Sequence, residues 1–177
     1  MLAFSSLSVT AAIFIAGAHA SPTFYPDVTL APGLPSFESL GLTTKDLYTK
    51  PPVSSSSSSL EARSSNAQCV SAPEANGSVD GAIACYNILA RMGDASCPVP
   101  DNNRIFCSVN DIVVIGTNTN HISGGTSSSC GDVALAVQYI FNHCNVGGRV
   151  SGVAVANGNG NLMVGVYNKN YPSLPVS

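Results

Sequence analysis

Two stretches of the sequence carry apolar residues three and four positions apart, which is the spacing of an amphipathic helix. The first stretch predicts a helix over 79–92 that begins after Ser78, a favoured N-cap residue, and stops at Gly93. Its apolar face consists of Val79, Ile83, Tyr86 and Ala90. Gly81 lowers the intrinsic stability of this helix, so tertiary packing or Cys85 must help to hold it.

The second predicted helix begins after Ser129, another N-cap residue, and ends at the glycine pair 147–148. Asp132 takes the place of the Glu or Gln of a capping box, and its charge suits a helix N-terminus. The apolar stripe consists of Val133, Val137, Ile140, Phe141 and Cys144. His143 lies in the last turn, where a cationic imidazole suits the helix dipole.

Four further runs are rich in β-forming residues. Runs 104–109 and 112–118 are separated by Asn110-Asp111, which predicts either a hairpin or one long bulged strand. Runs 149–156 and 162–168 flank the Asn-Gly-rich turn 157–161, which predicts a second hairpin. We interpret residues 97–103 as a turn-rich connection and residues 118–129 as a polar loop.

The predicted elements follow the order α-β-β-α-β-β. Strands joined by hairpins favour an antiparallel sheet, and two helices can cover one of its faces. The sequence therefore predicts a small α+β domain with a four-stranded antiparallel sheet and two helices. Its core is small, so disulfides are expected to contribute to its stability.

The chain contains six cysteines, which are Cys69, Cys85, Cys97, Cys107, Cys130 and Cys144. An even number in a short secreted domain favours disulfides, and the spacings do not match those of a zinc site. Cys130 and Cys144 fall near opposite ends of the second predicted helix, roughly 21 Å apart. A disulfide requires Cα atoms within about 7 Å, so this pair is excluded and each helix is expected to be tied to another part of the chain.

The N-terminal part of the chain differs in character from the cysteine-rich part. Residues 1–20 combine a short apolar run with an Ala-His-Ala cleavage site, which predicts a signal peptide and a secreted, extracellular product. Residues 21–63 contain scattered prolines and the serine run 54–59, which predicts a disordered pro-segment or stalk. Cleavage after Arg63 would leave a cysteine-rich α+β domain at 64–177, in which we expect no transmembrane segment.

Charge and motifs reduce the number of function classes that fit the sequence. Only 10% of residues are charged, and the part of the chain after Arg63 contains four basic and six acidic residues. No nucleic-acid partner is therefore expected. We found no nucleophile, metal or phosphate motif and predict no catalytic residue, no cofactor and no metal. A ribonuclease would need a glutamate, histidines and an arginine converging on the sheet, whereas Glu74 lies outside every predicted strand.

Two polar segments are the candidate partner-binding sites, because loops on a rigid scaffold often carry function. The first holds His121 beside Asn118 and Asn120, and the second is the turn with Asn157 and Asn159. Asn76 begins an N-glycosylation sequon just before the first helix.

Four stretches carry a resemblance to a known family, namely 82–87 (AIACYN), 95–100 (ASCPVP), 129–134 (SCGDVA) and 156–162 (ANGNGNL). Through them the region 69–168 resembles the hypersensitive-response-inducing proteins, small secreted elicitors of plant-associated fungi. The resemblance implies an effector that triggers plant cell death and defence without catalysis, by binding an apoplastic or host-surface component. The predicted architecture is also similar to that of fungal killer-toxin-like domains, an analogy of fold alone.

Four functions follow as hypotheses from these observations. The first is an effector or elicitor that acts by recognition, and the second is a toxin-like domain that acts on a membrane target of competing cells. The third is a small secreted ribonuclease, and the fourth is a protein associated with the cell wall. The sequence shows no coiled-coil pattern, so a monomer is expected.

Overall fold

The computed structural model describes residues 24–49, 67–100, 102–158 and 160–175 of the chain. The predicted signal peptide, the serine run and the predicted cleavage site after Arg63 lie outside these residues. Within the described ranges, no helix is long and apolar enough to cross a membrane.

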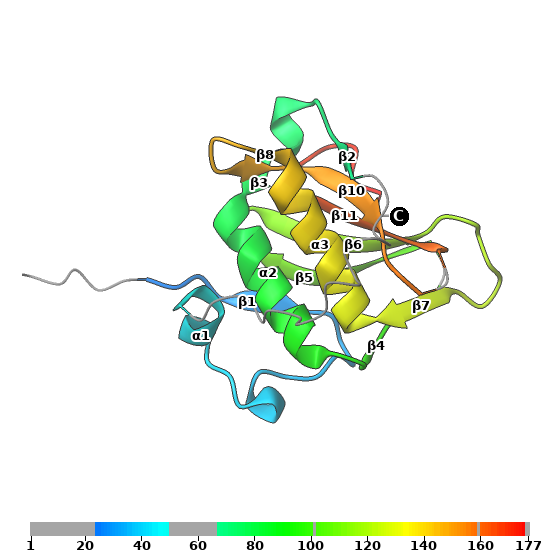
Figure 1. Cartoon of the computed structure of the whole chain (residues 1–177), viewed down its shortest axis with the longest axis horizontal. Coiled ribbons are helices and arrows are strands. Elements are labelled where there is room, and N and C mark those ends of the chain that lie inside the picture. The colour runs from blue at the N-terminus through cyan, green and yellow to red at the C-terminus, as the bar shows by residue number, and fades with distance from the viewer. Residues whose placement is uncertain (1–23, 50–66, 101, 159, 176–177) are drawn as a thin grey trace, which may run out of the picture.

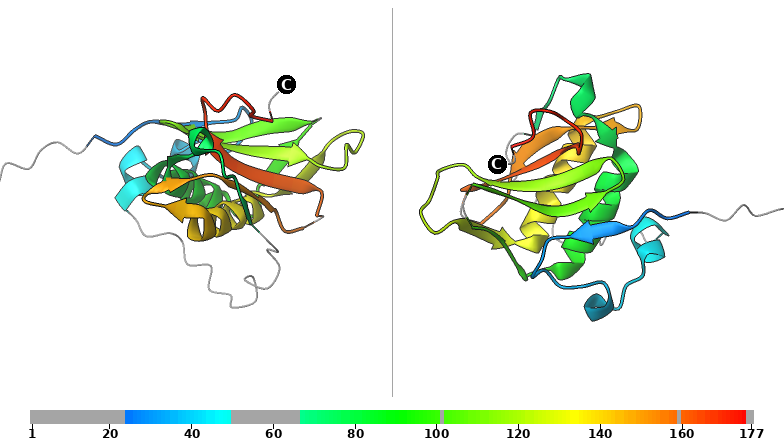
Figure 2. Two further views of the ribbon diagram at one scale, coloured as in Figure 1. Left: turned by 90° about the horizontal axis from the view of Figure 1, so that it is seen from above. Right: turned by 180° about the vertical axis from the view of Figure 1, so that it is seen from behind.

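The described residues form a six-stranded antiparallel sheet with two long helices on one face (Figure 1). From edge to edge the strands are β1 (Val28–Leu30), β5 (Asn103–Val109), β6 (Ile112–Asn118), β11 (Leu162–Asn168), β10 (Gly152–Val155) and β2 (Gln68–Cys69). The helices α2 (Val79–Met92) and α3 (Cys130–Cys144) lie side by side and form a layer on one face of the sheet, as the left view of Figure 2 shows.

Small ribbons of strands close both ends of this helix pair. Where α2 ends and α3 begins, β4 (Ser96–Val99) pairs with β7 (Thr126–Ser129). At the opposite end, β9 (Arg149–Val150) pairs with both β3 (Gly77–Ser78) and β8 (Asn145–Val146). The remaining elements are the short helices η1 (Glu38–Leu40), α1 (Thr44–Thr49) and η2 (Pro73–Ala75).

The predicted α+β class and the antiparallel hairpin formed by the last two predicted strands are confirmed. Of the two alternatives for residues 104–118, the hairpin is the one observed. The prediction of four strands is wrong. The four predicted strands form the centre of the sheet, and β1 and β2 extend it at its two edges. Neither short strand has the alternating pattern of a longer one, and each is held by main-chain bonds to an edge that would otherwise be open. The ribbon β4–β7 was missed because Pro98 and a run of serines carry no β signal.

The predicted run 149–156 also divides into two strands. Gly152–Val155 pairs with β11 in the large sheet, whereas Arg149–Val150 pairs with β3 and β8. The buried Ser151 lies between them, and its Oγ donates to Asn76 Oδ1 at 2.7 Å. The chain therefore changes partners at this serine, which a hydrophobic pattern does not reveal.

The prediction that residues 21–63 are disordered is wrong for residues 24–49. This segment forms β1, η1 and α1 and packs against the cysteine-rich domain, with β1 beside β5 and α1 beside α2 (Figure 1). Val28, Leu42 and the fully buried Leu47 join the same core as the residues of the long helices. Its apolar residues fall in short groups that Pro26, Pro32 and Pro35 interrupt, so no helix or strand of ordinary length can be recognised from the pattern.

All six cysteines form disulfides, and each bond joins a helix to a strand. Cys69 of β2 bonds to Cys144 at the end of α3, with a Cα–Cα distance of 5.3 Å. Cys85 of α2 bonds to Cys107 of β5, and Cys97 of β4 bonds to Cys130 at the start of α3. The exclusion of a bond between Cys130 and Cys144 is confirmed, since one continuous helix separates them.

The two long helices begin differently. Ser129 caps α3 as predicted, because its Oγ accepts from the Asp132 amide at 3.0 Å and donates to the Asp132 carboxylate at 2.8 Å. Ser78 makes no such side-chain cap; its backbone N–H donates instead to Asp111 Oδ1 at 3.1 Å. The start of α2 is thus held by the turn between β5 and β6 rather than by its own serine.

Helix α2 is buried on more sides than its sequence indicates. The predicted apolar face is only partly correct, because Val79, Ile83 and Ala90 are half-buried whereas Tyr86 is fully buried. The residues that are most completely buried are Ala82, Ala84, Cys85, Ile88 and Leu89. This helix lies between the sheet, α3 and α1, so a single amphipathic stripe does not describe it.

Gly81 marks the closest approach of α2 to the sheet. A Cβ atom at this position would lie 2.8 Å from Val109 Cγ1 and 3.3 Å from Ile112 Cβ. Glycine at this position allows α2 to pack closely on the sheet, and this packing offsets the lower helix propensity of glycine.

We expect Gly81→Ala to destabilise the protein although alanine favours helix. The gain in helix propensity is about 1 kcal/mol, and overpacking against the stiff Val109 side chain costs about 1–3 kcal/mol. Thermal and urea unfolding of the variant measure the difference. Asn142→Ala on the exposed side of α3 is the control for propensity alone, and a Gly81→Ala protein as stable as this control would contradict the close approach.

The opposite face of the sheet is partly covered by residues beyond β11. Val113, Ile115 and Tyr167 are buried there with Ala75, and Tyr171 and Leu174 pack on them. The Tyr167 ring lies over Gly165, where a Cβ atom would be 2.3 Å from the ring, and it stacks on Tyr171 at 6.0 Å between centroids. Burial, and then the neighbouring Tyr171, raise the pKa of Tyr167 above its ordinary value of 10.0.

This raised pKa predicts a loss of stability at alkaline pH. Below pH 10 the phenol is neutral in the folded and the unfolded protein, whereas above it the unfolded chain ionises first, so stability falls as pH rises toward the folded pKa. Burial also raises the pKa of Tyr48 and Tyr86. We expect urea unfolding between pH 9 and pH 11 to show this fall and Tyr167→Phe to reduce its slope; an unchanged slope would contradict the contribution of Tyr167.

Candidate functional site

The structure brings the two predicted binding segments together at one end of the sheet. The β6–β7 loop and the β10–β11 turn meet through Asn161, whose carbonyl oxygen accepts from the backbone N–H and the Oγ1 of Thr119, both at 3.1 Å. Asn120 Nδ2 also donates to Asn161 Oδ1. We call the surface formed by residues 119–125, 157–158 and 160–161 the loop platform.

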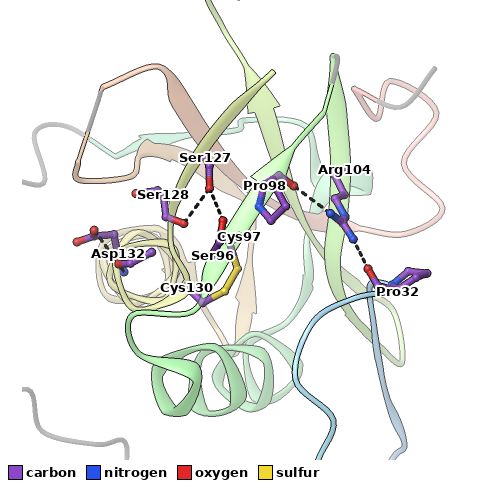
Figure 3. Close-up of a disulfide and its surroundings, with 10 residues drawn as sticks. Pro32, Ser96, Cys97, Pro98, Arg104, Ser127, Ser128, Cys130 and Asp132 are labelled. Carbon is purple, nitrogen blue, oxygen red and sulfur yellow. Dashed lines mark hydrogen bonds between the residues drawn. A yellow bond between two sulfur atoms is a disulfide. The ribbon is translucent and has the colours of Figure 1, made fainter. Parts of the chain in front are cut away.

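The loop platform is also tied to the start of α3. Ser128 Oγ donates to the Asn157 carbonyl oxygen, and a Cβ atom at Gly158 would lie 3.0 Å from the same Oγ. Ser96 and Ser127 join the neighbouring strands through their hydroxyl groups at 2.7 Å. Figure 3 shows these serines around the disulfide between Cys97 and Cys130. The β10–β11 turn is therefore bonded to β7, and the disulfide between Cys97 and Cys130 ties β4, the partner strand of β7, to α3. We call β4, β7 and this disulfide the disulfide-linked base of the platform.

Asn118 is inside the molecule, although the sequence suggested it as a partner contact. Only 1% of its surface is exposed. Its side chain closes the loop, since Nδ2 donates to the Ile122 carbonyl at 3.0 Å and Oδ1 accepts from the Ile122 N–H at 3.2 Å. The bond from the Gly125 N–H to the Ile122 carbonyl holds the same turn, and Asn118 adds two side-chain bonds to it. Asn118 therefore positions the platform from inside the molecule.

The exposed tip of the β6–β7 loop consists of Asn120, His121 and Ile122. His121 has a positive φ of 47°, an uncommon backbone conformation outside glycine, which turns the chain sharply between Asn120 and Ile122. Ile122 keeps 39% of its surface exposed in a loop that is otherwise polar. Together they present one imidazole, one aliphatic side chain and neutral amides to solvent, a combination suited to binding rather than to charge recognition.

The other predicted residues fall in different places. Asn157 is half-buried and contributes its carbonyl to the platform, and Asn159 lies outside the described residues. Asn76 of the sequon is half-buried, and its glycosylation remains a prediction. Asn161, Thr119 and Ser128 lie within the predicted segments 118–129 and 157–161, but the sequence did not single them out as the residues that join the segments.

Arg104 and Arg149 hold parts of the fold together. Arg104 donates to the carbonyl oxygens of Pro98 and Pro32 (Figure 3). Arg149 forms an ion pair with Asp111 at 2.9 Å and donates to the Asn76 carbonyl. His143 packs its ring on Tyr139, with 3.9 Å between centroids. Among the described residues, no three histidine, cysteine, aspartate or glutamate side chains gather as metal ligands would.

These features define the class of the protein as a disulfide-stapled α+β domain with a polar loop platform at one end of its sheet. The chain belongs to the family described as a domain of unknown function, DUF8794, whose model matches residues 64–168. That range contains every cysteine and both long helices, and it begins after the N-terminal segment that carries β1 and α1. No curated protein and no solved structure matches the chain.

Replacing Asn118 by alanine should loosen the loop platform. The substitution removes the acceptor of the Ile122 N–H and one of the two donors to the Ile122 carbonyl, which still accepts from the Gly125 N–H at 2.9 Å. We expect a cost of roughly 1 kcal/mol. We expect a lower melting temperature and faster amide hydrogen exchange at Ile122. Ser123→Ala is the control, because Ser123 is an exposed polar residue of the same loop; equal effects of the two substitutions would contradict the structural role of Asn118.

Proposed function

We propose that this protein is a secreted effector or elicitor that acts through recognition of its loop platform rather than through catalysis. The observation that carries the proposal is the convergence of the two Asn- and Gly-rich segments on a disulfide-linked base. A loop surface held rigidly loses little entropy on binding, which favours recognition. The resemblance of the cysteine-rich region to the hypersensitive-response-inducing proteins supplies the kind of partner, a host-surface or apoplastic component of a plant.

Secretion is part of this proposal. Six paired cysteines in a small domain are typical of proteins that fold in an oxidising compartment. The sequence of residues 1–20 supports the same conclusion through its apolar run and cleavage site. An extracellular location would place the loop platform in contact with other cells.

Infiltration of leaves with the purified protein tests the proposal. We expect local cell death or an oxidative burst from the oxidised protein and none from the reduced and alkylated form, because reduction releases both helices from the sheet. No response to either form across several plant species would contradict the elicitor function. Growth inhibition of other fungi by the same preparation would point to a toxin, and degradation of RNA to a ribonuclease.

A pair of double variants locates the active surface. Replacing His121 by asparagine, which tolerates a positive φ, together with Ile122→Ser removes the exposed contacts of the platform and retains its backbone. We expect this variant to need a dose roughly ten times higher for the same response. The matched control, His143→Asn with Val146→Ser, changes an exposed histidine and an exposed aliphatic residue elsewhere. Equal losses in both variants would show that another surface is recognised.

A further inference from the structure

We infer that the edge of β5 and the neighbouring side of α2 form a binding site for an apolar peptide of a partner protein, which adds an extended strand to β5. Residues 26–48 of this chain occupy the site as a built-in ligand, and cleavage between this segment and the domain makes it replaceable. The site lies away from the loop platform (Figure 1), and the inference does not depend on the proposed function.

The first part of the site is the main-chain edge of β5. In β1, Val28 pairs with Val109 and Leu30 with Cys107, and the next N–H, of Ala31, donates to the Phe106 carbonyl at 3.0 Å. An edge strand exposes a row of unpaired N–H and C=O groups that accept any extended chain of suitable register. Addition of a strand to such an edge is a common way in which proteins bind peptides.

The second part is an apolar surface that takes the side chains of the segment. Val28 is buried beside β5, and Leu47 of α1 is fully buried against the core that contains α2. Leu30, Leu34 and Phe37 pack on the same core with part of their surface exposed. The view from behind shows the segment following the edge of the sheet and then turning back toward α2 (Figure 2). The occupant is therefore anchored by side chains at both of its ends.

The third part consists of two polar side chains of the domain that bind main-chain carbonyls of the segment. Asn87, which is only 3% exposed on α2, donates from Nδ2 to the Leu47 carbonyl at 2.7 Å. Arg104 at the start of β5 donates to the Pro32 carbonyl (Figure 3). Main-chain carbonyls are present in every peptide, so these contacts do not require the sequence of this segment.

The segment has no covalent tie to the domain except the chain itself. Every disulfide lies within residues 69–144, and residues 24–49 contain no cysteine. The family model begins at residue 64, directly after the cleavage site that the sequence predicts. A cut there converts the segment into a separate peptide whose affinity alone decides how long it stays.

Removal of the segment would leave groups that favour a new occupant. The side of α2 that Leu47 covers would be exposed to water, and the edge of β5 would be open. Exposed apolar surface and an open edge strand are both unfavourable. A peptide that adds a strand to β5 and places an apolar side chain against α2 covers both, as residues 26–48 do.

The test uses the full chain with a specific protease site placed in the serine run 54–59. After cutting under non-reducing conditions, we expect the N-terminal fragment to co-elute with the domain and a fluorescent peptide of residues 24–49 to exchange into the site. An alternating Val-Thr octapeptide should displace that probe, and the same octapeptide with central prolines should not, because proline lacks the N–H of a strand. Release of the fragment on cutting without rebinding of the probe would overturn the inference, as would dimerisation of the domain through β5 or failure of the octapeptide to compete.

Two sets of variants assign the contacts. Asn87→Ala in the domain should weaken binding of the probe roughly tenfold or more, and Asn142→Ala, an exposed asparagine of α3, should leave it unchanged. If Asn87→Ala prevents folding, the probe itself carries the change: Leu47→Ala should weaken its binding to the unaltered domain, and Lys45→Ala should not. Equal binding of all these variants would contradict the proposed contacts.

Discussion

Each disulfide in the domain joins a helix to a strand, and the rest of the structure depends on this covalent frame. The bonds close loops of 75, 22 and 33 residues, for which the chain-entropy model gives about 3–4.5 kcal/mol each when taken singly. The loops overlap, so these contributions do not add. Their common effect is to fix α2 and α3 on one face of the sheet, where Tyr86 meets Phe141 edge to face.

The disulfide frame explains how glycine backbones can pack directly against the side chains of neighbouring elements. At Gly81 the helix backbone nearly touches Val109, and at Gly116 a Cβ atom would lie 2.4 Å from the Phe106 ring. The contact at Gly81 requires that helix α2 and strand β5 take the same relative position each time the chain folds, and the contact at Gly116 requires the same of β5 and β6. The bond between Cys85 and Cys107, two residues from Val109, supplies the first of these constraints.

Sequence patterns predicted the helices and strands whose apolar residues recur at regular spacing. They did not predict the elements whose position depends on individual tertiary contacts. Helix α2 and the central hairpins follow from spacing and turn chemistry, and the bounds of α2 agree with the prediction. The short strands β1 and β2 escaped because they depend on an edge that only the tertiary structure creates. At the loop platform, the turn residues indicated its place, but nothing in the sequence showed that Asn118 points inward while His121 remains outside.

The loop platform and the surface under the N-terminal segment are held in place by different kinds of contact. The loop platform is held by bonds between two segments that both lie within residues 64–168, the range of the family model. The N-terminal segment lies outside that range, and its contacts with Asn87 and Arg104 involve main-chain carbonyls. The frame keeps α2 and β5 together through Cys85 and Cys107 whether or not the segment is present. The surface under the segment therefore has its own covalent support, which is a requirement for a site that can exchange one peptide for another.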